Sequence, residues 1–289
     1  MSMATGINLF SVHEQLADDY FGTLEKVAAA GYRNIELIGF NMKKLSRFSD
    51  EFAATDIQAS LDRLGLQAIA MHEAMMPGQD ILAHDWDAAM KYCDGLGCPS
   101  IVLPSVMISD EESALKTAEQ LNRLGSQMKE RGFRLYVHNH AHEFKKAGEV
   151  ALLELLADNT DPAHLKFELD LVWVMRAGTD PIAVLKRLGD RCDMIHQKDL
   201  NKELAGPLDI LEAMKQNGNE HLGLFEAYGK YVAPTDFVDL GTGAFDFATV
   251  YAKLKEMGYV RYALVENEGK SADKIQSIAN DLIYLQKFV

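Results

Sequence analysis

Short apolar runs alternate with amphipathic segments of helix length along the whole chain, and most junctions between them contain glycine. A glycine just after a helix is a common left-handed cap, and here the next few residues lead into a β-rich run. Together with residues 6–12, this pattern predicts eight strands separated by helices. The seven later strands are predicted within NIELIG, QAIAMHE, PSIVLPS, RLYVHNH, LKFELD, CDMIHQKD and YALVEN.

The alternation of strands and helices indicates βαβ units and a parallel sheet, and the nearly continuous apolar runs indicate burial on both faces. A closed barrel and an open doubly wound sheet both satisfy this pattern. The count of eight favours the barrel, as does the lack of a GxGxxG motif after the first strand. We therefore predict an α/β protein with a (β/α)8 TIM barrel as a single domain over residues 1–289. A long loop insertion around residues 222–245 is expected over the mouth, carrying a hairpin or an extra strand.

The formal charge of −14 disfavours nucleic acid and anionic membrane surfaces as partners, because no local run of Lys or Arg offsets it. The N-terminal residues lack a basic and apolar signal segment, and no apolar run approaches the ~18 residues of a membrane span. We expect a cytoplasmic protein. The three cysteines include no CxxC pair and lie in or beside apolar segments, which predicts buried reduced thiols.

Ionisable residues follow the apolar runs at the predicted carboxyl ends of the strands, the face where barrel enzymes carry their chemistry. Because this pattern recurs at several strand ends, a chance origin is improbable. The residues are Glu36, His72, Glu73, His138, His140, Asp170, His196 and Glu266.

Three of these residues could share a metal ion. Asp170, His196 and Glu266, with one donor from the fifth strand, would give a mixed nitrogen and oxygen site that suits Mn, Fe, Co, Zn or Mg. Taken singly, Asp170 could cap the next helix, His196 could be a hydrogen-bonded interior histidine and Glu266 could pair with a lysine. The joint pattern on three strand ends favours the metal.

Six segments, in the same order, resemble the xylose isomerase-like barrels of the sugar phosphate isomerase/epimerase superfamily. The resemblance implies a (β/α)8 barrel, a divalent metal and carbonyl–hydroxyl chemistry on a sugar or polyol. It also implies ligands Glu, Asp, His and Glu on strands five to eight, of which Asp170, His196 and Glu266 match. The segments are residues 7–37, YVHNHAHEF, FELDLVWVMRAGTDP, MIHQKD, DLGTGAFDF and YALVEN.

The fifth strand departs from the family pattern. Many relatives read Glu-Asn-His here, whereas this chain reads His138-Asn139-His140, as one branch of the superfamily also does. The alignment therefore makes His138 the fourth ligand, with Glu143 as the competitor. By strand alternation His138 and His140 point to the same side. The family's epimerases use two carboxylates on opposite faces of the substrate carbon. Here Glu266 remains as one base, and His140 or Glu143 would serve as the other if the reaction needs one.

Other polar and aromatic residues are expected to contact the substrate. Lys198 could neutralise an oxyanion or orient a hydroxyl, or else form a salt bridge with Asp170 or Glu168. The residues predicted to bind substrate are His72, Glu36, Trp173 and Phe40. Histidines assigned to the surface or to loops, without a role, are His13, His84, His142, His164 and His221.

The function predicted first is a metal-dependent sugar isomerase or epimerase that acts through an enediolate. The alternative is a lyase, either a dehydratase of a keto-inositol or an eliminase of a 3-keto-glycoside. A metal-dependent endonuclease is disfavoured by the acidic charge, and an inactive sugar-binding barrel is disfavoured by retention of Asp170, His196 and Glu266. A small sugar or polyol is the expected partner, and a homo-oligomer is compatible with the sequence.

Overall fold

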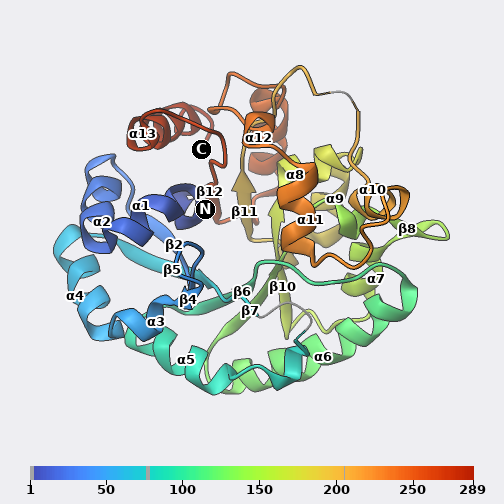
Figure 1. Ribbon diagram of the computed structural model, residues 1–289, viewed down its shortest axis with the longest axis horizontal. Coiled ribbons are helices and arrows are strands. Elements are labelled where there is room, and N and C mark those ends of the chain that lie inside the picture. Colours follow the sequence, from blue (N-terminus) through green and yellow to red (C-terminus); the bar gives the residue numbers. More distant parts are fainter. Residues whose placement is uncertain (1–2, 76–78, 205) are drawn as a thin grey trace.

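The computed structural model describes residues 3–75, 79–204 and 206–289, and it contains a closed barrel of eight parallel strands (Figure 1). The strand order is β1-β12-β11-β10-β7-β6-β5-β2, and β1 pairs with both β2 and β12. Closure excludes the doubly wound sheet and confirms the predicted (β/α)8 barrel. The strands are β1 (Ala4–Asn8), β2 (Asn34–Ile38), β5 (Gln67–His72), β6 (Ser100–Leu103), β7 (Arg134–His138), β10 (Leu165–Asp170), β11 (Met194–Gln197) and β12 (Tyr262–Val265).

One outer helix follows each barrel strand, and these helices form the outer ring in Figure 1. They are α2 (Tyr20–Ala29), α4 (Ala54–Leu64), α5 (Trp86–Gly95), α6 (Glu111–Glu130), α7 (Leu152–Asp158), α9 (Pro181–Leu188), α12 (Phe247–Met257) and α13 (Lys274–Leu285). Shorter elements interrupt the connections: α1 (His13–Asp18), α3 (Phe48–Glu51), α8 (Leu171–Arg176), α10 (Ile210–Gln216), α11 (Leu224–Tyr231), and the hairpins β3–β4 (Phe40–Asn41, Ser46–Arg47) and β8–β9 (Lys146–Ala147, Val150–Ala151).

The helix ends follow local sequence signals. Helices α4 and α12 end at Gly65 and Gly258, whose φ angles of 66° and 71° are those of the predicted left-handed caps. At the start of α6, Asp110 accepts a hydrogen bond from the Ser113 N–H at 2.8 Å, which satisfies one of the free donors of the first turn. These caps set the residues at which the three helices begin or end.

The barrel interior changes from apolar to polar along three strands toward their carboxyl ends. Because side chains alternate along a strand, positions two residues apart face the same side. The lower member of each pair belongs to a small apolar cluster inside the barrel, and the upper member is polar and buried. The pairs are Tyr136 and His138, Met194 and His196, and Leu264 and Glu266. The polar side chains at the carboxyl ends of these strands therefore lie next to the small apolar cluster inside the barrel.

Residues 222–245, which the structure describes throughout, do not form the predicted hairpin or extra strand. Residues 222–245 contain α11 and a short turn, Pro234–Asp236, and their one strand-like contact is the isolated bridge between Leu200 and Phe237. Figure 1 shows α11 inside the outer ring, over the barrel. The prediction that this insertion lies over the mouth agrees with its position.

Asp199 anchors the end of this connection. Its carboxylate accepts hydrogen bonds from the backbone N–H groups of Gly241, Gly243 and Phe245 at 2.9–3.0 Å. A Cβ atom on Gly243 would lie 2.2 Å from Asp199 Oδ1, so only glycine fits this close approach. The DLGTGAF segment thus fixes the last part of the connection that contains α11 to the chain just after β11.

The sequence predictions on thiols and membrane segments can be compared with the structure. Cys93, Cys98 and Cys192 are buried free thiols, as predicted. In the part of the chain that the structure describes, none of the helices combines the length and the apolar character needed to cross a membrane.

Candidate functional site

The four residues predicted as metal ligands lie together at the carboxyl ends of four neighbouring strands. One potential ligand atom from each of His138, Asp170, His196 and Glu266 lies within 4.8 Å of the others, and all four side chains are buried. They come from β7, β10, β11 and the residue after β12, which are consecutive in the barrel. Two imidazole nitrogens and two carboxylate oxygens converging in this way could hold a divalent cation.

Asp170 uses its two carboxylate oxygens for different tasks. Oδ1 accepts hydrogen bonds from the N–H groups of Val172 at 2.9 Å and Trp173 at 2.8 Å, which caps α8. Oδ2 lies 2.7 Å from Lys198 Nζ, on the side of the cluster. The capping interpretation of Asp170 is therefore confirmed, and its position is compatible with a ligand role, which stays a prediction.

Lys198 is the buried cation of this cluster, with 1% of its surface exposed. It pairs with Asp170 and Glu266, and with Glu268 at 3.1 Å, but Glu168 is not among these partners. Burial opposes its charge, yet Asp170 and Glu266 raise the pKa of Lys198 above its ordinary value. Burial likewise opposes the charge of Glu266, yet Lys198 and His196 hold the pKa of that carboxyl well below its usual range. At neutral pH the pair is ionised.

Glu168, which the sequence analysis did not assign to the site, lies directly beneath the predicted ligands. It is fully buried, and its Oε2 lies 2.8 Å from His72 Nε2 and 3.4 Å from His138 Nδ1. Its Oε1 lies 3.1 Å from His196 Nε2. The signal was present in the sequence, because Glu168 precedes Asp170 by two residues and must share its face of β10.

Glu36 and His72, predicted to bind substrate, have partners inside the barrel. Glu36 Oε2 accepts a hydrogen bond from Asn8 Nδ2 at 2.6 Å and lies 2.6 Å from His196 Nε2. Burial, followed by the nearby Glu168 carboxylate, raises the pKa of Glu36. Both residues thus belong to the layer under His196, and their contact with substrate stays a prediction.

Aromatic rings line the site from above. The His140 ring lies 5.4 Å from that of Trp173 and 4.7 Å from that of Tyr228, between ring centroids. Tyr228 belongs to α11, and its hydroxyl oxygen accepts hydrogen bonds from the N–H groups of Ala141 and His142 at 3.0 and 3.2 Å. The insertion therefore reaches the end of β7. The sequence analysis missed Tyr228, because no local pattern marks it.

Glu143 and His142 lie in the turn after β7, and both are buried. A neighbouring group of potential metal ligands consists of His72, His138, Glu168 and His196. Within the described residues, Glu143 joins neither this group nor the one at the strand ends, so the geometry favours His138 as the fifth-strand donor. Glu143 Oε2 accepts a hydrogen bond from the His140 N–H at 3.0 Å, and burial raises the pKa of Glu143 to about 8. His142, assigned to the surface or to a loop, lies in this turn but is buried, and its Nε2 lies 2.8 Å from the Val106 carbonyl oxygen.

The raised pKa of Glu143 predicts a pH-dependent stability difference. The folded protein keeps Glu143 protonated up to about pH 8, whereas the unfolded chain ionises near pH 4.3. The protonated Glu143 carboxyl therefore makes its full contribution to the free energy of unfolding below about pH 4, and this contribution is lost as the pH rises to about 8. We expect Glu143→Gln to gain stability relative to the wild type over this range, by about 3–5 kcal/mol at pH 8. Urea unfolding from pH 5 to 9 measures it, and a pH-independent difference would contradict the assignment.

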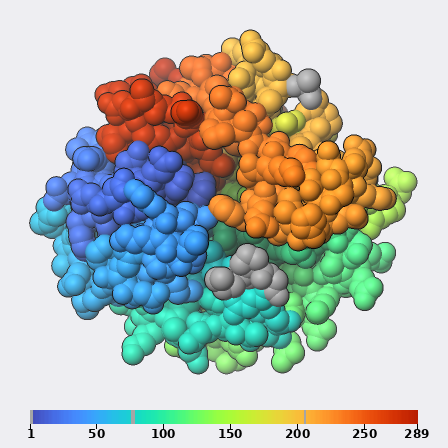
Figure 2. All heavy atoms as spheres, viewed as in Figure 1, coloured from blue at the N-terminus to red at the C-terminus, as the bar shows by residue number. Residues whose placement is uncertain are grey.

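Phe40 and Glu73 lie near the ends of β2 and β5. Phe40 is half-buried at the start of the β3–β4 hairpin, and its predicted contact with substrate stays a prediction. Glu73 is fully buried, forms an ion pair with Arg47 of the same hairpin and lies 2.7 Å from His84 Nε2. His84 therefore has a structural partner, and the hairpin is fastened to the rim. Figure 2 shows a hollow between this blue region and the orange atoms of α11.

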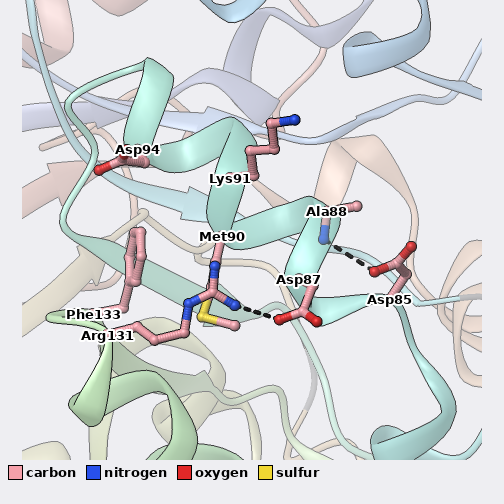
Figure 3. Close-up of a pocket in the computed structure, with 8 residues that line it drawn as sticks. All are labelled: Asp85, Asp87, Ala88, Met90, Lys91, Asp94, Arg131 and Phe133. Atoms are coloured by element: carbon pink, nitrogen blue, oxygen red, sulfur yellow. Dashed lines mark hydrogen bonds and ion pairs between the residues drawn. The ribbon is translucent and has the colours of Figure 1, made fainter.

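A second hollow lies on the outer wall, between α5 and the turn that follows α6 (Figure 3). Two of its polar contacts are an ion pair between Arg131 and Asp87 and a hydrogen bond from the Ala88 N–H to Asp85. It brings together no cluster of histidines and carboxylates like that at the strand ends. We therefore place the functional site at the barrel mouth.

Comparison with known proteins identifies the class of this barrel. Residues 24–288 match the family described as xylose isomerase-like TIM barrel, and the chain belongs to that family. The resemblance noted from the sequence is thereby confirmed.

Among curated relatives, the chain is 29% identical over 180 residues to an inosose dehydratase of Clostridium perfringens, covering 62% of this chain and 54% of that protein. It is 30% identical over 150 residues to an inosose dehydratase of Geobacillus kaustophilus, covering 51% and 43%. The aligned part thus spans about half the length of these relatives.

Solved structures extend the likeness in fold over almost the whole chain. A sugar phosphate isomerase/epimerase from Parabacteroides distasonis has a TM-score of 0.73 at 23% identity, with 99% of this chain and 94% of that chain covered. The IOLI protein with a bound zinc atom has a TM-score of 0.72 at 16% identity, with 99% of both chains covered. At these identities the likeness establishes the fold alone.

Proposed function

We propose that this protein is a divalent-metal-dependent lyase that removes water from a cyclic keto-polyol of the inosose class. The observation that carries the proposal is the asymmetry of the site, in which the fifth-strand position of the proposed ligand set holds the imidazole of His138 instead of a carboxylate, while Glu266 pairs with Lys198. Elimination needs one base, whereas epimerisation needs an acid on the opposite face. The names of the relatives at 29–30% identity support the substrate class.

The residues present fit a divalent metal. The donor set of His138, Asp170, His196 and Glu266 combines two imidazoles with two carboxylates and contains no thiolate, which suits Mn, Co, Zn, Fe or Mg. Once bound, such an ion polarises a substrate carbonyl and makes the neighbouring C–H more acidic.

The side chains around this set have distinct tasks in the proposed reaction. A Glu266 oxygen, ionised at neutral pH, accepts the proton from the carbon beside the carbonyl, and Lys198 Nζ donates a hydrogen bond to the oxygen on which charge develops. Glu143, protonated near neutral pH because burial raises its pKa to about 8, holds a proton for the leaving hydroxyl. Trp173 provides an apolar wall.

A sugar isomerase is the second candidate, and His140 is the observation in its favour. Burial lowers the pKa of His140 well below its ordinary value, which keeps the imidazole neutral. Its Nδ1 is buried and has no hydrogen-bond partner among the described residues. A neutral, unpaired imidazole nitrogen could act as the second base that epimerisation requires.

The test separates the two reactions. Metal-loaded protein is incubated in deuterated water with inososes, keto-sugars and 3-keto-glycosides, and the products are followed by NMR. We expect an inosose to exchange its carbonyl-adjacent hydrogen and to lose water. Label in a product of unchanged formula would favour the isomerase instead, and no exchange in any substrate would reject both. Glu266→Gln removes the proposed base and should abolish this exchange. Glu256→Gln, on the exposed face of α12, is the matched control for that variant.

A further inference from the structure

We propose that Glu168 is a positioning residue that holds both histidines of the metal centre, and that its charge replaces the carboxylate which His138 displaces from the ligand set. The inference rests on the proposed metal site and adds a residue that lies outside the four ligands. Two independent features carry it, namely the contacts of the two carboxylate oxygens and the strand register.

The two oxygens of Glu168 face the two histidines separately. Both contacts are close charge contacts rather than hydrogen bonds: Oε2 lies 3.4 Å from His138 Nδ1, and Oε1 lies 3.1 Å from His196 Nε2. The hydrogen-bond partner of His196 Nε2 is Glu36 Oε2 at 2.6 Å. The other nitrogen of His196, Nδ1, lies 2.7 Å from Glu266 Oε2. An imidazole that donates its N–H to a carboxylate presents the lone pair of its second nitrogen to a metal. His196 Nε2 is engaged by Glu36 and Glu168, which lie outside the proposed ligand set, and His138 Nδ1 faces Glu168. We therefore take His138 Nε2 and His196 Nδ1 as the ligand atoms.

The register of the barrel makes the contact between Glu168 and His138 unavoidable. The two residues are direct partners in the parallel pairing of β7 and β10, and both point into the barrel. Glu168 is fully buried, so its charge needs partners that replace water. It finds them in three imidazoles, because His72 Nε2 lies 2.8 Å from its Oε2.

The charge of the site supports the same role. The resemblance implies three carboxylates among the ligands, whereas the set proposed here has two, Asp170 and Glu266. Glu168, the direct strand partner of His138, would place a further carboxylate beside a bound cation, outside the ligand set. A histidine at position 138 and a glutamate at position 168 should therefore depend on each other.

The test is a double-variant cycle read out by cobalt binding, which needs no turnover. Equilibrium affinity is measured for Co²⁺ by competition with a chelator, and stoichiometry by elemental analysis, for the wild type, Glu168→Gln, His138→Glu and the combined variant. Glu168→Gln should keep one ion per chain but bind it about 10–100-fold more weakly. Its Co²⁺ absorption bands should also change, because the histidines are no longer held in one orientation.

His138→Glu should bind weakly too, because it places two carboxylates face to face across the β7–β10 ladder. Adding Glu168→Gln to that variant should restore affinity at least tenfold, since the family arrangement is then rebuilt. Circular dichroism verifies the fold of each variant, and Glu256→Gln is the surface control.

Four results would overturn the inference. Wild-type affinity for Co²⁺ in Glu168→Gln would show that Glu168 does not act on the metal site. Purely additive effects in the combined variant would show that positions 138 and 168 do not depend on each other. Two ions in the wild type and one in Glu168→Gln would make Glu168 a ligand of a second site with His72. A wild type that binds no Co²⁺ would reject the metal site itself, which separates failure of the proposed function from failure of this inference.

Discussion

Asp170→Asn should reduce metal affinity and turnover by more than about 100-fold while changing the free energy of unfolding by less than about 1 kcal/mol. Asn is as good a helix N-cap as Asp, so the hydrogen bonds from Val172 and Trp173 to Oδ1 are kept. The anionic Oδ2 that faces Lys198 is lost. The substitution therefore separates the two tasks of one carboxylate.

Asp170→Ala is the matched comparison, because it removes both tasks. We expect the same loss of metal binding and an additional loss of about 1 kcal/mol from the missing cap. Urea unfolding in the presence of a chelator gives the stability, and Co²⁺ titration gives the affinity. Full activity in Asp170→Asn would remove Asp170 from the ligand set, whereas a loss of several kcal/mol in that variant would make its role structural.

The barrel and the strand-end cluster could be predicted because their signals are local. Glycine caps such as Gly65 and Gly258 mark where helices end, and the alternation of side chains fixes which residues face inward. Once eight strands close, ionisable residues at their carboxyl ends must converge. The grouping of His138 with His196 follows from that closure, although their role as ligands remains a proposal.

The sequence showed that Glu168 shares the inward face of Asp170, but its contacts depend on the register between β7 and β10 rather than on either strand alone. Any inward-facing residue of β10 could have been an ordinary core position. Only the pairing opposite His138 brings its carboxylate beneath the two histidines.

The helix α11 was mispredicted for a different reason. The prediction was a hairpin or an extra strand, and the sequence LFEAYGKY contains three aromatic residues and Gly229, all weak helix formers. Packing against α10 overrides that preference, because Ala227 is buried with Ile210 and Met214 in a small apolar cluster. The contact of Tyr228 with the end of β7 is equally nonlocal.

Lys198→Met is expected to destabilise the chelated protein by about 3–5 kcal/mol and to abolish turnover. The ammonium group is buried among Asp170, Glu266 and Glu268, and methionine leaves these carboxylates without their cation. Lys166→Met is the matched control, because Lys166 pairs with Asp193 at 2.6 Å lower on the barrel and is 30% exposed. That partly exposed pair should be worth no more than about 1 kcal/mol.

A divalent ion should rescue the stability of Lys198→Met but not its activity. Asp170 and Glu266 belong to the proposed ligand set, so a bound cation supplies part of the charge that the substitution removes. We expect Mn²⁺ or Co²⁺ to raise the melting temperature of Lys198→Met more than that of the wild type. Turnover should stay low, because the donor to the developing oxyanion is still missing. Full turnover of the metal-loaded variant would restrict Lys198 to its ion pairs and remove it from the reaction.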